Sequence, residues 1–182
     1  MMRKSNLVLI IAVAVLAFFF LAFQAIMHDY IDKVDRRKVV SDFKEEIRTV
    51  SSFKRIYNSQ DATIYFTQDS ITTIKIKGPE TYISKVKIRV VGDTLFIDKT
   101  PEIRKKDSVK IFISNPGLIE IDMSSGTMFE TVHQVLGDKI ELHFSNASKG
   151  YLDLSYKSVK CKAVSDSKVN IKGNSNHIDF TN

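Results

Sequence analysis

The 182-residue sequence contains one cysteine, Cys161. A single cysteine cannot form a disulfide within the chain, so the hydrophobic core must stabilise the fold. It also excludes a lipoprotein anchor near the N-terminus and a zinc site built on cysteine pairs. With only 7 glycines, the chain has no phosphate-binding glycine loop, and no serine hydrolase motif occurs. The net charge is only +6, with one basic run at Arg36-Arg37-Lys38, so we expect no nucleic-acid partner.

The longest uncharged stretch covers residues 7–27 and contains one polar side chain, Gln24. As a helix, these 21 residues would be about 31 Å long, enough to cross a hydrocarbon core of roughly 30 Å. The alternative is a cleaved signal peptide, but its apolar region is usually only about 7–15 residues long, and no small-x-small cleavage site follows here. We therefore predict a transmembrane signal anchor at 7–27, preceded by a cytoplasmic tail at 1–6.

Charged residues on both sides of this segment bear on its orientation. Arg3 and Lys4 favour a cytoplasmic N-terminus under the positive-inside rule, whereas Lys33 and the basic run at 36–38 favour the opposite. A tail of six residues is easily left inside, and the following sequence is typical of a translocated domain. We therefore predict a single-pass protein whose C-terminal domain lies outside the cytoplasm.

Residues 28–50 are predicted to form a juxtamembrane helix or linker. Apolar residues recur near helical spacing from Ile31 to Ile47, with charged residues between them. The alternative is an amphipathic helix that lies on the bilayer surface, although the apolar stripe is thin.

From residue 51 onward, apolar residues alternate with polar ones, which is typical of strands with one buried face. The alternating runs before the C-terminal part lie at 63–66, 73–77, 85–91, 95–97 and 109–113. Turn residues separate these runs, as at Gly78-Pro79 and Asn115-Pro116-Gly117. We therefore predict one all-β domain over residues 51–182.

The C-terminal part contains an internal repeat. Strand-like segments run into serine-bearing turns at Ser124, Ser145 and Ser165, a spacing of 21 and then 20 residues. Repeats of this length stack so that neighbouring units bury a shared core. We predict a short β-helix-like stack of strands; the alternative is an antiparallel meander of evenly spaced hairpins. In such a stack, one inward column would consist of Ile119, Ile140, Val159 and Ile178.

Several segments resemble one protein family. Phe53-Lys54-Arg55-Ile56 followed by residues 62–68, and the run 73–78 leading to Gly92-Asp93-Thr94, resemble the start of the "putative autotransporter adhesin, head GIN domain" family. Ser125-Gly126-Thr127 is similar to that family's repeated Ser-Gly-Ala-Ser turns. The resemblance implies a right-handed β-helix-like domain in the envelope of Gram-negative bacteria, with adhesion as its proposed role. The sequence departs from the family because only one serine turn keeps its glycine and no Gly-Ile-Asn tripeptide occurs.

Histidine and cysteine do not predict a reactive site. His143 and His177 fall at outward positions nearly two coils apart and share no acidic neighbour, so we expect no metal site. Cys161 alternates with Val159 and Ala163, which predicts a buried and unreactive thiol.

Carboxylates offer the strongest enzymatic alternative. Glu120, Asp122 and Glu141 could neighbour one another on an outer face. A glycosidase needs two carboxyl groups about 5–9.5 Å apart within a cleft, and no long loop is available to form its walls. Lys139 and Lys160 are instead expected to be cross-strand charge partners of these carboxylates. A sugar-active enzyme is the least expected function, and no catalytic residue or cofactor is predicted.

The first functional hypothesis is a membrane-anchored binding or adhesion module with a protein or glycan ligand. Its candidate surface is a polar ladder of Ser125, Asn146 and Asp166 at the coil corners. The alternative for this ladder is purely structural, because tight corners require small residues. The location predicted from the anchor and the family resemblance is the bacterial inner membrane, with the β domain in the periplasm.

The second hypothesis is an envelope assembly or sensing component. The C-terminal coil would leave a strand edge with unpaired backbone groups. Such an edge could pair with a partner protein or with a second copy of the chain.

Overall fold

The structure, a computed structural model, describes four stretches of the chain. These are residues 20, 23–24, 43–99 and 109–181. The chain divides into two units, Met1–Ser41 and Asp42–Asn182. The predicted tail at 1–6 and most of the predicted anchor at 7–27 lie outside the described residues. Among the residues that are described, no helix is long and apolar enough to cross a membrane.

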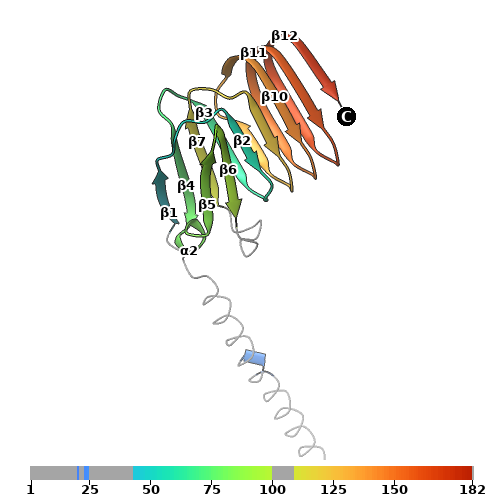
Figure 1. Ribbon diagram of the computed structural model, residues 1–182. Coiled ribbons are helices and arrows are strands. Elements are labelled where there is room, and N and C mark those ends of the chain that lie inside the picture. The colour runs from blue at the N-terminus through green and yellow to red at the C-terminus, as the bar shows by residue number, and fades with distance from the viewer. Residues whose placement is uncertain (1–19, 21–22, 25–42, 100–108, 182) are drawn as a thin grey trace, which may run out of the picture. The chain divides into compact units, whose positions relative to one another are not determined.

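The prediction of an all-β domain is confirmed. A single 12-stranded sheet dominates the second unit, and the one helix described there is α2 (Glu80–Ile83) (Figure 1). All the alternating runs named above form strands. The strands are β1 (Phe43–Arg48), β2 (Arg55–Asn58), β3 (Thr63–Gln68), β4 (Thr73–Pro79), β5 (Val86–Val91), β6 (Thr94–Lys99), β7 (Lys110–Asn115), β8 (Glu120–Met123), β9 (Met128–Thr131), β10 (Val135–Phe144), β11 (Lys149–Ala163) and β12 (Lys168–Thr181).

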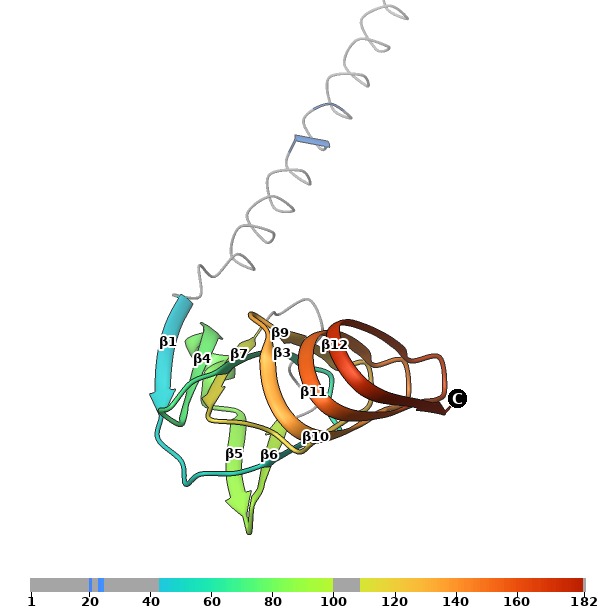
Figure 2. The ribbon, with the colours of Figure 1, turned by 90° about the horizontal axis from the view of Figure 1, so that it is seen from above.

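The sheet curls around the core, so that it forms two facing walls (Figure 2). The strand order is β1-β4-β7-β3-β9-β11-β10-β8-β2-β6-β5, and β12 pairs with β11. The long strand β11 runs around the bend, because its residues 149–151 pair with β9 and its residues 154–163 pair with β10. We call the side from β1 to β9 the first wall and the side from β10 to β5 the second wall.

The C-terminal strands stack in parallel, one turn of the chain on the next. On the second wall, Glu120 pairs with Glu141, Glu141 with Lys160, and Lys160 with Asp179. These partners are 21, 19 and 19 residues apart, close to the intervals between the serine-bearing turns. Parallel pairing excludes the antiparallel meander for this part of the chain, because hairpins would pair neighbouring strands in opposite directions.

The N-terminal part of the domain departs from a simple stack of coils. β1 and β4, β4 and β7, and β5 and β6 are antiparallel pairs. In addition, β2 lies between β6 and β8, and β3 lies between β7 and β9. In space, β2 and β3 therefore form the second turn of the stack, between the turn of β6 and β7 and the turn of β8 and β9. In sequence, β2 and β3 precede all four of these strands.

Alternate residues of both walls form one hydrophobic core. Its largest fully buried members include Phe66, Phe129 and Phe144, and the rings of Phe66 and Phe129 lie 6.3 Å apart. Among the described residues, 27 hydrophobic side chains are buried, and all of them lie between Phe53 and Cys161, within the unit Asp42–Asn182. A unit with its own core can fold alone, and we therefore expect a fragment of residues 42–182 to fold.

The predicted inward column is correct for only two of its four members. Ile140 and Val159 are 0% and 1% exposed, whereas Ile119 and Ile178 are 40% and 47% exposed. Ile178 is on β12, and no described strand pairs with the far edge of β12 to cover it. Ile119 precedes β8 and lines a surface pocket.

The helical prediction for the end of the 28–50 segment is also wrong where it can be tested. Residues 43–48 form strand β1, which pairs antiparallel with β4. Two ion pairs favour this edge position, since Glu45 accepts from Lys75 at 2.8 Å and from Lys77 at 2.7 Å. Residues 28–42 lie outside the described residues.

Candidate functional site

Three similar turns join the two walls at one corner of the domain, and we call them the corner turns. They span residues 124–127, 145–148 and 164–167. In each turn, the N–H of the fourth residue donates to the carbonyl of the first, at 3.2, 3.2 and 3.3 Å. Both central residues of every turn have positive φ, the conformation of a type I′ turn.

The members of the predicted polar ladder, Ser125, Asn146 and Asp166, are all exposed at this corner. Ser125 and Asn146 occupy the first central position of their turns, with φ of 56° and 52°. In the third turn Ser165 takes that position, because the interval between the last two turns is 19 residues. Asp166 therefore lies level with Ala147, one residue further along the turn.

A second column of side chains at this corner points inward. The hydroxyl groups of Thr127, Ser148 and Ser167 donate to the carbonyls of Gln60, Met123 and Phe144, at 2.9, 3.1 and 2.9 Å. Each hydroxyl thus ties a corner turn to the neighbouring coil. Met123 and Phe144 end their strands, and Gln60 lies in the loop after β2. Sequence reasoning missed this column, although a Ser or Thr recurs at the fourth position of every turn.

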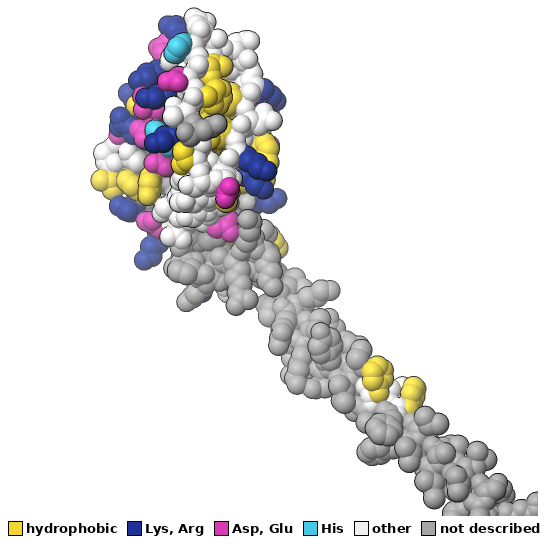
Figure 3. Space-filling model, turned by 90° about the vertical axis from the view of Figure 1, so that its right-hand side faces the viewer, with side chains coloured by type: hydrophobic (Ala, Val, Ile, Leu, Met, Phe, Trp, Pro, Cys, Tyr) yellow, Lys and Arg dark blue, Asp and Glu magenta, His cyan; other side chains and the backbone are white. Residues whose placement is uncertain are grey.

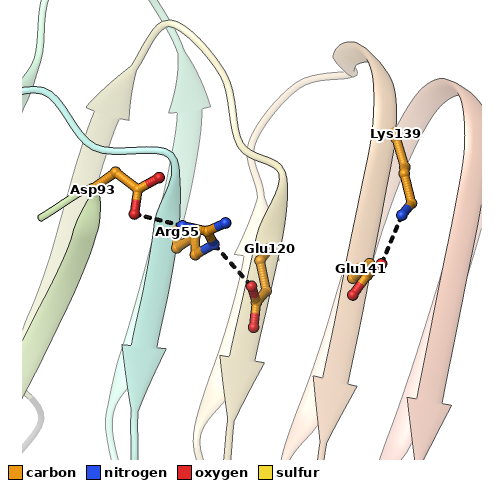
Figure 4. Close-up of polar contacts among 5 residues, drawn as sticks. All are labelled: Arg55, Asp93, Glu120, Lys139 and Glu141. Atoms are coloured by element: carbon orange, nitrogen blue, oxygen red, sulfur yellow. Dashed lines mark hydrogen bonds and ion pairs between the residues drawn. The ribbon is translucent and has the colours of Figure 1, made fainter.

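Two of the carboxylates proposed as the enzymatic alternative, Glu120 and Glu141, lie side by side on the second wall (Figure 4). Arg55 donates through Nε to Glu120 at 3.0 Å and pairs with Asp93 at 2.5 Å. Lys139 pairs with Glu141 at 2.8 Å, and this hydrogen bond lowers the pKa of Glu141. A glycosidase acid needs a raised pKa, so Glu141 is unsuited to that role.

Further charges surround these carboxylates on the second wall. Figure 3 shows side chains of both signs gathered in a band beside a column of hydrophobic side chains. Asp122 lies beside His143 in the register of β8 and β10; burial raises the pKa of Asp122, and the neighbouring His143 opposes this rise. His177 is exposed on β12. Within the described residues, no group of three His, Cys, Asp or Glu side chains could hold a metal ion.

Cys161 is fully buried, as predicted from its position in the strand. Burial raises the pKa of its thiol to about 11. A thiol that is both inaccessible and protonated at neutral pH does not act as a nucleophile.

The outer face of the first wall, continued across the adjoining ends of β11 and β12, carries a row of planar side chains, which we call the aromatic stripe. Strand register brings together Phe112, Tyr65, Glu130, Tyr151 and Asn170, one from each of five adjacent strands. The rings of Tyr65 and Phe112 stack at 5.0 Å with an angle of 16°. Tyr151 is 46% exposed. The individual tyrosines were visible in the sequence, but their alignment depends on pairing between distant strands.

A shallow hollow lies at the C-terminal end of this stripe. Its volume is about 280 Å³, and Glu130, Tyr151 and Asn170 line it together with Asp153 and Lys172. Asp153 accepts from Lys172 at 3.2 Å and from Gln134 at 3.0 Å, so its position is fixed. The hollow therefore presents one aromatic face, carboxylates and an amide to solvent.

A larger pocket lies where the chain passes from β7 to β8, and we call it the bend pocket. Its volume is about 540 Å³, within the usual range of small-molecule sites. Its apolar wall is formed by Phe53, Leu118, Ile119 and Leu136. Sequence reasoning missed this pocket too, because its lining comes from segments before β2, after β7 and at the start of β10.

Comparison with known proteins is decisive for the family. Residues 52–182 match the family described as "Putative auto-transporter adhesin, head GIN domain". The chain belongs to this family. The match confirms the resemblance seen in the sequence, and it covers nearly the whole β domain. No curated protein sequence matches the chain.

Solved structures of similar fold include two putative adhesins and one putative lipid binding protein. The adhesin from Bacteroides fragilis has a TM-score of 0.53 and 15% identity, over 77% of this chain and 97% of that one. The adhesin from Parabacteroides distasonis has a TM-score of 0.61 and 15% identity, over 76% and 69%. The putative lipid binding protein, also from Parabacteroides distasonis, has a TM-score of 0.56 and 13% identity, over 76% and 59%. At these identities the likeness shows a common fold.

Proposed function

We propose that the chain is a non-catalytic binding module of the bacterial cell envelope. Its β domain would lie outside the cytoplasm, tethered to the inner membrane by the apolar segment 7–27. Membership of a family of adhesin head domains supports this role. The ion pairs of Glu120 and Glu141 support it further, because they occupy the carboxylates that an enzyme would need.

The aromatic stripe is the proposed contact surface, and a glycan is the proposed ligand. The flat face of a tyrosine offers apolar area to the faces of a sugar ring, while carboxylate and amide groups bond to hydroxyls. Adjacent strands are about 4.8 Å apart, so Tyr65 and Tyr151, two strands apart, can contact a chain of sugars at intervals of about 10 Å. The exposure of Tyr151 beside Glu130 and Asn170 is the observation that carries this proposal.

The test measures binding of soluble oligosaccharides to the 42–182 fragment, first on a glycan array and then by calorimetry. Tyr151→Ala should weaken binding about tenfold, which corresponds to about 1.4 kcal/mol. Tyr57→Ala is the matched control, because Tyr57 is 39% exposed on the second wall and should leave binding unchanged.

A third variant tests the corner instead of the stripe. It replaces Ser125, Asn146 and Asp166 together by glycine, which suits the positive φ of these positions. Glycan binding that is lost in this variant and kept in Tyr151→Ala would assign contact to the polar ladder and refute the stripe. If no oligosaccharide binds, the glycan proposal fails.

The second candidate function is assembly through β12. Ile178 and Phe180 on this strand are 47% and 57% exposed, and no described strand pairs with its far edge. An open edge with apolar side chains is suited to adding a strand from another chain. Sedimentation of the 42–182 fragment should then show dimers that Phe180→Lys dissociates; a fragment that remains monomeric at all concentrations would exclude self-association.

A further inference from the structure

The bend pocket is held open by polar side chains that already have partners. Gln68 donates to the carbonyls of Pro116 and Leu136 at 2.7 and 3.0 Å, and accepts from the N–H of Leu136 at 2.8 Å. Asn115 donates to the carbonyls of Phe53 and Gly117 at 3.0 and 2.7 Å. These amides brace the loops around the pocket, and their bonds are used within the protein.

Part of the apolar wall of the pocket is accessible to solvent. Phe53 and Leu118 are buried, but Ile119 is 40% exposed and Leu136 is 55% exposed. Ile119 precedes β8 and Leu136 lies at the start of β10, and both line the cavity. An apolar group that enters the pocket would remove their surface from water, which favours binding.

Most charged residues of the lining are neutralised by neighbours. Asp93 pairs with Arg55 at 2.5 Å, and Asp138 pairs with Lys157 at 2.6 Å. Lys139 is paired with Glu141 on the second wall. The two aspartates therefore oppose an incoming anion only weakly, and the hydrogen bond from Lys157 lowers the pKa of Asp138.

Lys54 differs from these residues. It is exposed and lines the pocket, and its ammonium group makes no ion pair with any described residue. Its backbone is fixed on both sides, because its N–H donates to the carbonyl of Asp93 and its carbonyl accepts from Ile119, both at 2.8 Å. Lys54 thus places beside the apolar wall a positive charge that no described residue pairs, on a backbone that is held in position.

We propose that the bend pocket binds amphipathic carboxylates, with the alkyl chain against Ile119 and Leu136 and the carboxylate beside Lys54. Concave shape, exposed apolar wall and one unpaired cation together select this class over neutral or cationic amphiphiles. The site is separate from the aromatic stripe, so it adds a small-molecule ligand to a module whose proposed contact with glycans lies elsewhere.

The test uses octanoate and octylammonium, two ligands with equal alkyl chains and opposite charge. Amide NMR spectra of the 42–182 fragment are recorded during titration with each. Octanoate should shift the amides of Ile119, Leu136 and Gly137 in a saturable way, and octylammonium should bind at least about fivefold more weakly. Equal affinities for the two ligands, or saturable shifts elsewhere without shifts at these amides, would overturn the proposal.

Variants separate the contribution of charge from that of the apolar wall. Lys54→Gln should weaken octanoate binding about two- to fivefold, the range of an exposed ion pair, and should leave octylammonium no weaker than before. Leu136→Ser should weaken both ligands. Lys162→Gln is the matched control, because Lys162 is exposed on the outer face of β11, and it should change neither. Tyr151→Ala should also leave octanoate binding unchanged, which distinguishes this site from the stripe; an unaltered affinity in Lys54→Gln would refute the role of Lys54.

Discussion

Replacing Gly137 by alanine should destabilise the domain through one defined contact. A Cβ atom at this position would lie 2.3 Å from Cε1 of Tyr156, far inside van der Waals contact. The Tyr156 ring cannot move away easily, because it is 3% exposed and its hydroxyl donates to the carbonyl of Leu118 at 2.9 Å. The same burial raises the pKa of Tyr156 to about 12.

The magnitude follows from three contributions. Overfilling a well-packed site costs about 1–3 kcal/mol, and loss of the Tyr156 hydrogen bond would add about 1 kcal/mol. Alanine restricts the unfolded chain more than glycine, which offsets about 0.4–1 kcal/mol. We therefore expect Gly137→Ala to lower the free energy of unfolding by about 1–3 kcal/mol, and the Tm by about 3–12 °C for a domain of this size.

A double-mutant cycle on the 42–182 fragment assigns this cost to Tyr156. Urea denaturation is measured for Gly137→Ala, for Tyr156→Leu and for the double variant. With leucine at position 156, the alanine methyl group should have room, and Gly137→Ala should become nearly neutral. If the alanine costs the same with tyrosine or leucine at position 156, the contact does not cause the destabilisation and the reasoning fails.

Three further predictions concern the corner, an ion pair and the buried thiol. Ala147 has a φ of 61°, which strains alanine but not glycine, so Ala147→Gly should raise the free energy of unfolding by about 0.5–1 kcal/mol in urea denaturation; a decrease would contradict this. Lys139 lowers the pKa of Glu141, so the stabilisation from the ionised pair is present above the ordinary glutamate pKa and is lost as the pH falls through the lowered value. Lys139→Met should return the pKa of Glu141 toward its ordinary value in a carboxyl NMR titration, and an unchanged titration would exclude the pair. Cys161 should react with iodoacetamide only after unfolding, as followed by mass spectrometry, and modification of the native domain would show that the core opens.

Local pattern was enough to predict the strands, and it failed where strand pairing decided the outcome. Alternation in residues such as Ile74 and Ile76 requires a half-buried strand wherever it lies in the sheet. Residues 43–48 have mixed spacing, and their conformation as β1 is decided by pairing with β4 and by the lysines across from Glu45. Such a tertiary contact is not encoded in the segment itself.

The candidate sites were harder to predict than the fold. The aromatic stripe depends on the register of five strands that are far apart in sequence, and a shift by one residue would turn Tyr65 and Tyr151 into the core. The bend pocket depends on the placement of the segment before β2 beside the loop after β7. The corner was easier, since its turn residues recur at regular intervals, although the 19-residue interval moved Asp166 out of line with Asn146.

The position of β2 and β3 has a consequence for how the domain folds. Arg55 reaches Glu120 across 65 residues of sequence, and Asn58 reaches Thr127 across 69. Contacts this distant are slow to form because closing the long intervening loop costs conformational entropy before the contact stabilises it. In a chain that emerges N-terminus first, β2 and β3 can pair with β6 and β7 once these have followed, but their other edges stay unpaired until β8 and β9 are made. Any chaperone that meets the nascent domain would find those two strand edges exposed until then.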